Sequence, residues 1–346
     1  MPPALNVGCT VMAISRKKRI LGLVLLLVLE CVAIPALYFN STRYKVERLL
    51  GQVGPPSWPI AMLIKFNVVK SSEHLPYRMV IDELVKLGSP AVPALGDALA
   101  DSSVDISVRL TAAEVLGMIG DKRALSTLLN CMKDGDVNVR IVVIDIIGRL
   151  HDRQATQPLI DCLHDSDEVI RFFSIEALGA IKDPRAFEPS LASTRDKDGR
   201  VRSGAVESLA NLGDKRALPR VLEMLTDTDS DVRRAAVNAL GELGGPENVE
   251  SLMTCTKDSD RDVVTRAWIE LGRVGDTRAF NPLVVLLLAP EREQVGYKRG
   301  EVISAIGNID HPDATAFLKR LRDDKNEDEN VRQAAQKALA APKVKN

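Results

Sequence analysis

The chain has 346 residues, 45% hydrophobic and 27% charged, a composition typical of folded proteins that excludes disorder over the whole length. Its 46 basic and 47 acidic residues give a net charge of −1, so the strongly basic character of many nucleic-acid-binding proteins is absent. Aromatic residues are scarce at 4%, which favours packed helices over β-sandwiches, and five cysteines are too few for a disulfide-built scaffold.

The N-terminal part predicts a membrane segment. Residues 20–39 are apolar apart from Glu30, and twenty helical residues span roughly 30 Å, the thickness of a bilayer core. Basic residues at 16–19 precede this segment, so the positive-inside rule makes 1–19 a cytoplasmic tail and the rest extracytoplasmic. A cleaved signal peptide is the alternative, although the sequence around Ala36 lacks a second small residue. The expectation is a single-pass membrane protein.

Residues 40–76 are expected to link this anchor to the rest of the chain, or to cap the domain that follows. Pro55, Pro56 and Pro59 interrupt any helix there. Residues 77–341 form the main domain, and residues 342–346 are a short tail.

A repeat with a step of 31 residues fills the main domain. Aspartates recur at this step, as do arginines that each follow a valine or isoleucine. They are Asp134, Asp165, Asp196, Asp227 and Asp258, with Arg109, Arg140, Arg171, Arg202 and Arg233. Apolar residues at helical spacing follow each arginine, and a second helix completes each unit. Two short helices cannot bury their apolar faces alone, so the pattern predicts an all-α, right-handed solenoid of about eight stacked helix pairs.

Units such as Asp229 to Gly244 resemble HEAT repeats, and the short 31-residue form resembles the phycobilisome-lyase type of HEAT-like repeat. The resemblance implies that the aspartate and arginine columns form a structural ladder along the stack. It also implies that the helix containing each arginine lines the concave side of the solenoid. Val264 replaces the arginine in one unit, and about four extra residues precede Arg299.

Few residues suggest chemistry. Asp134, Asp136 and Asn138 resemble the start of a calcium loop, but Val139 occupies the position that such a loop reserves for glycine. Cys131, Cys162 and Cys255 share one repeat column, and stacked helices are too far apart there for a disulfide. The four histidines are scattered, and no nucleophile or phosphate-binding motif occurs. We therefore expect no catalytic residue, metal site or cofactor.

The best candidate for a binding site is one face of the arginine-containing helices. Five positions after the arginines, the sequence places an acidic column; one and two positions after them, it places an apolar patch. The acidic column consists of Glu114, Asp145, Glu176 and Glu207, and the apolar patch of Ile141, Val142, Phe172 and Phe173. Together they predict a groove for a basic amphipathic segment. The alternative is that these side chains pack against neighbouring helices or the N-terminal region.

These observations favour a membrane-anchored protein-interaction scaffold that binds a protein or peptide on its concave face and has no enzymatic activity. A bilin lyase or lyase-like chaperone subunit is the alternative that the repeat resemblance implies. Nucleic-acid binding is a third hypothesis, disfavoured by the acidic column and the net charge. The partner's identity and the oligomeric state are not predicted.

Overall fold

A computed structural model describes residues 41–50, 77–288 and 296–341. These residues form α-helices and short 3₁₀ helices, with no strand among them. The predicted all-α class with stacked helix pairs is therefore confirmed for the described part of the chain, whereas the handedness of the stack remains a prediction. The chain divides into two compact units, Met1–Ala124 and Leu125–Asn346.

The first unit contains four described α-helices and two 3₁₀ turns. They are α3 (Thr42–Leu50), α5 (Tyr77–Leu87), η2 (Ser89–Ala91), α6 (Val92–Ala100), α7 (Ile106–Ile119) and η3 (Lys122–Ala124). Helix α3 packs on α5 and α6 and buries Val46, Leu49 and Leu50 against them. The region predicted as a linker thus contributes one amphipathic helix to this unit.

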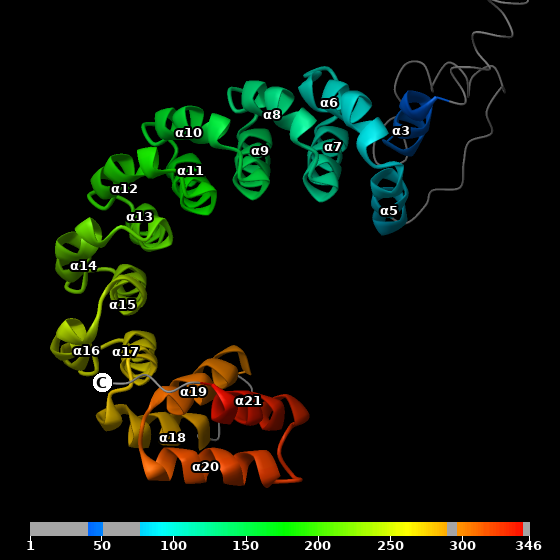
Figure 1. Ribbon diagram of the computed structural model, residues 1–346. Helices are drawn as coiled ribbons and strands as arrows, with labels where there is room; N and C mark the ends of the chain where they lie inside the picture. The colour runs from blue at the N-terminus through cyan, green and yellow to red at the C-terminus, as the bar shows by residue number, and fades with distance from the viewer. Residues whose placement is uncertain (1–40, 51–76, 289–295, 342–346) are drawn as a thin grey trace, which may run out of the picture. The chain divides into compact units, whose positions relative to one another are not determined.

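The second unit is built from two layers of helices (Figure 1). The long helices are α9 (Val137–Leu150), α11 (Glu168–Ile181), α13 (Gly199–Leu212), α15 (Ser230–Leu243) and α17 (Arg261–Arg273). The short helices are α8 (Leu125–Cys131), α10 (Thr156–Cys162), α12 (Phe187–Ser193), α14 (Leu218–Met224) and α16 (Val249–Cys255). Consecutive long helices contact one another, and each short helix packs on the long helix that follows it. Figure 1 shows the long helices on the inner side of this unit.

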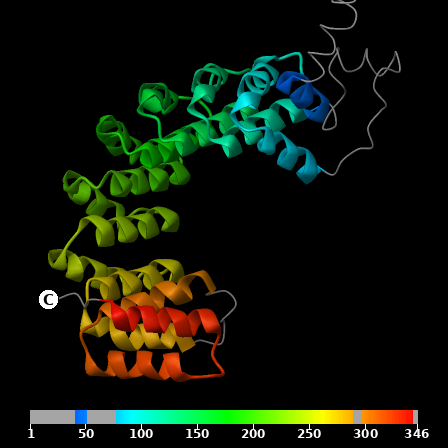
Figure 2. The ribbon, with the colours of Figure 1, turned by 45° about the vertical axis from the view of Figure 1, so that its right-hand side comes forward.

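The unit ends in four helices that continue both layers. They are α18 (Phe280–Leu288), α19 (Gly296–Asn308), α20 (Pro312–Asp323) and α21 (Glu329–Ala340). Helices α19 and α21 extend the row of long helices beyond α17, and α18 and α20 pack against them. Figure 2 shows these four helices gathered at one end of the stack.

An aspartate caps the N-terminus of each of the five long helices α9, α11, α13, α15 and α17. The Asp136 carboxylate accepts a hydrogen bond of 2.8 Å from the backbone N–H of Asn138, which satisfies a donor that the first helical turn leaves open. Asp167, Asp198, Asp229 and Asp260 cap the next four long helices in the same way. Asp152, Asp183, Asp214 and Asp276 cap the 3₁₀ turns that precede three of the short helices, α10, α12 and α14, and helix α18.

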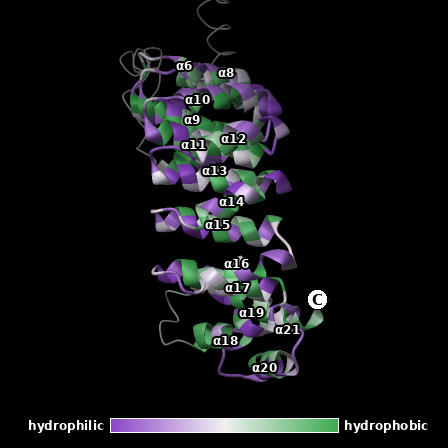
Figure 3. Cartoon of the chain, turned by 90° about the vertical axis from the view of Figure 1, so that its left-hand side faces the viewer, coloured by the Kyte–Doolittle hydropathy of each residue, from purple (hydrophilic) through white to green (hydrophobic). Residues whose placement is uncertain are grey.

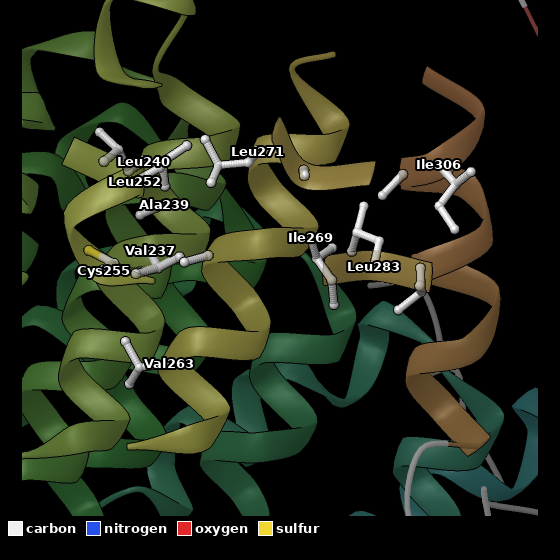
Figure 4. Close-up of a cluster of buried hydrophobic side chains, with 14 of the residues drawn as sticks. Val237, Ala239, Leu240, Leu252, Cys255, Val263, Ile269, Leu271, Leu283 and Ile306 are labelled. Atoms are coloured by element: carbon white, nitrogen blue, oxygen red, sulfur yellow. The ribbon is translucent and has the colours of Figure 1, made fainter. Parts of the chain in front are cut away.

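The apolar positions of the repeat form a continuous core. In α9 these positions are Val139, Val143, Ile144, Ile147 and Leu150, and all five are buried. Figure 3 shows hydrophobic and hydrophilic residues alternating along the helices, as expected for amphipathic helices that bury one side. Figure 4 shows how side chains of α15 to α19, including Leu240, Leu271 and Ile306, meet in one cluster. Each repeat in this cluster therefore buries its apolar side chains against those of the neighbouring repeats.

The localisation predicted from the sequence needs correction. Within the described residues, the structure contains no helix with the length and apolar character that crossing a membrane requires. The five longest helices have 14 residues, about 21 Å at the helical rise, whereas a span needs about 20 residues. For the residues that the structure describes, the prediction of a single-pass membrane protein with an extracytoplasmic solenoid is therefore wrong. Residues 1–19, 20–39 and 342–346, to which the tail, anchor and end segment were assigned, lie outside the described residues.

Candidate functional site

Ion pairs link consecutive repeats of the second unit. Arg171 on α11 donates from Nε and Nη2 to the two carboxylate oxygens of Asp196, at 2.8 and 2.9 Å. Its Nη1 donates to the backbone carbonyls of Asp165 and Ser166. The Arg202–Asp227 and Arg233–Asp258 pairs repeat this two-pronged geometry at 2.8 to 2.9 Å. Each arginine thereby ties its helix to the turn of the next repeat.

The aspartate of each pair also stabilises the turn in which it lies. Asp258 accepts the backbone N–H of Asp260 at 2.8 Å and so shapes the turn before α17. Hydrogen bonds from Arg233 lower the pKa of the Asp258 carboxyl, so it is ionised at neutral pH. One carboxylate thus sets the local turn and receives the arginine of the preceding repeat.

The two earlier arginines are placed differently. Arg140 reaches Asp165 through a single contact of 2.7 Å between Nη1 and Oδ2, and its buried Nε has no hydrogen-bond partner. Arg109, in the first unit, donates from Nε to the backbone carbonyl of Leu99 at 2.9 Å. Asp134 accepts the N–H of Asp136, as the other column members do in their turns. The regular column in the sequence therefore corresponds to three two-pronged pairs and one single contact within the second unit.

The predicted apolar patch lies on α9 and α11, where Ile141, Val142, Phe172 and Phe173 are each partly exposed. The Phe172 and Phe173 rings meet edge to face, with centroids 5.4 Å apart. Phe172 also leans toward α13, where a Cβ on Gly204 would lie 3.6 Å from the ring. Packing on a neighbouring helix, the alternative raised by the sequence, therefore accounts for part of the burial of Phe172, and part of the patch remains exposed.

Three residues of the predicted acidic column lie together in the second unit. Asp145 on α9, Glu176 on α11 and Glu207 on α13 are exposed, and we call these three the acidic row. Glu114, the fourth residue of the column, is on α7 in the first unit and is partly buried. Asp145 is engaged by Arg149 at 2.6 Å, one turn further along α9.

The acidic row has a distinctive electrostatic environment. Neighbouring helices partly exclude water from the Glu176 carboxyl, and this desolvation raises its pKa. The charges of Glu207 and Asp145 raise the pKa of Glu176 further, so both carboxyls are within electrostatic reach of Glu176. Desolvation also raises the pKa of Glu207, against the lowering effect of Arg234. Glu176, at the centre of the row, is therefore a position where neighbouring negative charges repel the carboxylate and a nearby cation would be favoured.

The sequence analysis did not single out one buried acidic side chain, Glu270. Glu270 on α17 is fully buried, with Oε1 at 2.9 Å from Arg273 and at 3.7 Å from Arg266. Gly241 on α15 leaves the space for it, because a Cβ there would lie 2.1 Å from Glu270 Oε2. The sequence does mark this position, since earlier repeats carry a small residue in the column where Glu270 stands. These residues are Ala239, Ser208 and Ala177.

The remaining candidates are the residues of the calcium hypothesis and the cysteines of the repeat column. Among the residues that the structure describes, no group of three or more histidine, cysteine or acidic side chains could hold a metal ion. Asp136, which the calcium hypothesis needs, caps α9. Cys255 is buried, and this burial raises the pKa of its thiol to about 11, so it is protonated at neutral pH.

Comparison with known proteins identifies the family. The family model described as HEAT repeats matches residues 66–137, 125–191, 188–271 and 232–298, more than half of the chain. The chain belongs to the HEAT-repeat family. This confirms the family that the sequence predicts. No curated protein matches the chain.

Several solved structures have a similar fold. YibA of E. coli is 18% identical, with a TM-score of 0.52, over 79% of this chain and 100% of that one. The karyopherin Kap121p is 15% identical, with a TM-score of 0.52, over 75% of this chain and 35% of that one. The complex of CpcE and CpcF of phycocyanin lyase from Nostoc sp. PCC7120 is 20% identical, with a TM-score of 0.45, over 72% of this chain and 93% of that one. At these identities the likeness to YibA and Kap121p, whose TM-scores exceed 0.5, concerns the fold alone.

Proposed function

We propose that this HEAT-repeat protein is an interaction scaffold that binds a basic segment of a partner protein on the face of α9, α11 and α13. The observation that carries the proposal is the acidic row beside the partly exposed Phe172 and Phe173. HEAT repeats suggest a scaffold of this kind, because stacked repeats present an extended, pre-formed surface.

The charges of this face define the partner. Repulsion among the carboxylates of the acidic row is relieved when a lysine or arginine lies between them, so the row favours cationic residues. The aromatic pair beside the row offers apolar area that an aliphatic or aromatic side chain would cover. A segment that combines both kinds of residue matches the face better than a purely basic one.

A structure with a similar fold supports binding to a short segment. Kap121p has been solved bound to the extreme C-terminus of the protein phosphatase Cdc14p, and that structure has a TM-score of 0.52 over 76% of this chain. It supports the idea that such a helix stack can hold a terminal segment of another protein. No observation on the described residues favours the bilin-lyase or the nucleic-acid hypothesis.

The test is a change of charge on this face. Replacing Glu176 and Glu207 together by glutamine should weaken the binding of a lysine- and leucine-containing peptide by about ten-fold or more, roughly 1.4 kcal/mol. The control variant replaces Glu188 and Glu223, exposed residues on the short helices α12 and α14, and removes the same number of charges. Fluorescence anisotropy would measure both affinities. Equal affinity of the two variants would contradict the proposal.

Peptide affinity should also depend on pH. The pKa of Glu176 and that of Glu207 lie above their usual 4.5 in the free protein, and a bound cation would lower both. The complex then holds fewer protons than the free protein, so affinity should fall as the pH drops from 7.5 toward 5. The Glu176→Gln/Glu207→Gln variant should lose most of this dependence. An affinity of the wild-type protein that is independent of pH would argue against contact with the row.

A further inference from the structure

We infer that the bound segment is extended, with a basic residue at every third position, one for each of α9, α11 and α13. This inference rests on the proposed function and adds the conformation and spacing of the partner. It follows from the distance at which the face repeats its carboxylates.

The helices of the face are closely packed. A Cβ on Gly148 of α9 would lie 2.9 Å from the Ala177 Cα of α11, and a Cβ on Gly179 would lie 2.9 Å from the Ser208 Cα of α13. Glycine at these two contacts allows the helix backbones to approach closely, and packed helices lie about 8–10 Å apart. The acidic row has one carboxylate per helix, at the same position of each repeat, so its charges recur at about this distance.

One conformation of a peptide has this period. A polyproline II segment rises about 3.1 Å per residue and has three residues per turn, so equivalent side chains recur every ~9.3 Å. In a β-strand, side chains on one side recur every second residue, ~6.7 Å apart, and the residue three positions further along the strand points to the opposite side. An α-helix needs seven residues, about 10.5 Å, to return to the same face. The spacing therefore favours the polyproline II form.

The apolar residues of the face supply the second row of contacts. Phe173 and Glu176 lie three positions apart on α11, as Val142 and Asp145 do on α9, so the apolar and acidic positions run side by side. A three-fold segment can direct one row of side chains to the carboxylates and the next row to the apolar positions. On α13 the apolar positions are occupied by Ser203 and Gly204, both buried. The third repeat therefore offers the segment a carboxylate without an apolar contact.

Peptides with one composition and different lysine spacings test this inference. Three synthetic peptides of equal length would carry three lysines two, three or seven residues apart in the same serine- and leucine-containing background without proline, so that each could adopt a helix or an extended form. We expect the peptide with a spacing of three to bind the full-length protein at least about ten-fold more tightly than the other two. In the Glu176→Gln variant, which lacks the central charge, this preference should shrink, whereas Glu188→Gln should retain it.

Each outcome has a distinct meaning. Equal affinities for the three peptides would overturn the spacing and leave the proposed function standing, because charge alone would then explain binding. Tightest binding at a spacing of seven would overturn the extended form in favour of a bound helix. If none of the peptides binds, the proposed function itself fails.

Discussion

Replacing Arg171 by alanine should lower the free energy of unfolding by roughly 3–5 kcal/mol, because it removes one partner of a nearly buried ion pair. The Arg171 side chain is 6% exposed and Asp196 is 14% exposed, so the remaining carboxylate would stay poorly solvated. Four hydrogen bonds of Arg171, two to this carboxylate and two to backbone carbonyls, would be lost together. Urea unfolding followed by circular dichroism would measure the change.

Arg200 provides the matched control for Arg171. It lies on α13 and its side chain is 55% exposed, with contacts of 3.3 Å to Asp198 and 3.8 Å to Glu168. Exposed pairs of this kind contribute less than about 1 kcal/mol, so Arg200→Ala should change stability little. If Arg171→Ala unfolds at the same urea concentration as Arg200→Ala, the pairs between repeats do not stabilise the stack.

Replacing Gly241 by alanine should destabilise the protein by roughly 3 kcal/mol, because the new methyl group would enter the space of the Glu270 carboxylate. A Cβ at this position would lie 2.1 Å from Oε2 and 2.7 Å from Cδ of Glu270. The carboxylate would have to move within a closed core, which would disturb its contacts with Arg273 and Arg266. Urea unfolding again measures the loss.

A second substitution shows whether Glu270 is the cause. Alanine occupies the equivalent positions 239 and 177 in other repeats, so Glu270→Ala should make room for the methyl group. The Gly241→Ala/Glu270→Ala protein should therefore be more stable than the sum of the single changes by about 1–3 kcal/mol. Strict additivity of the two single effects would show that Gly241 and Glu270 do not interact.

The regular part of the fold could be predicted from the sequence because the same residue types recur at the same positions of each repeat. Apolar residues at helical spacing, such as Val139, Val143 and Ile147, determine which side of a helix is buried. An aspartate before each long helix, such as Asp136, provides a side-chain acceptor where the helix has open donors. These signals are local, and the step of 31 residues shows where they recur.

Departures from the repeat are visible in the sequence, but their structural effects could not be predicted, since these depend on contacts between different helices. The burial of Glu270 needs the missing side chain of Gly241, which lies 29 residues earlier on another helix. Phe172 leans toward Gly204 of α13, a contact between two helices that are separate in the sequence. Arg140 and Arg171 occupy the same column, yet Arg171 holds its aspartate with two hydrogen bonds and Arg140 holds its aspartate with one.

The membrane prediction had a different weakness. It depended on residues 20–39 alone, and the described helices do not support it.

For the binding face, the sequence indicated which residues share a column, whereas the electrostatic effect of Asp145 and Glu207 on Glu176 required the structure.

The most direct test of the account is to locate a bound basic peptide by hydroxyl-radical footprinting. Saturating the protein with the peptide that has lysines three residues apart should reduce oxidation of Phe172 and Phe173, which are partly exposed on the inner layer. Leu222 on the short helix α14 is 36% exposed and should react as before. Unchanged oxidation of the two phenylalanines, with protection of Leu222 instead, would place the peptide on the outer helices and contradict the account.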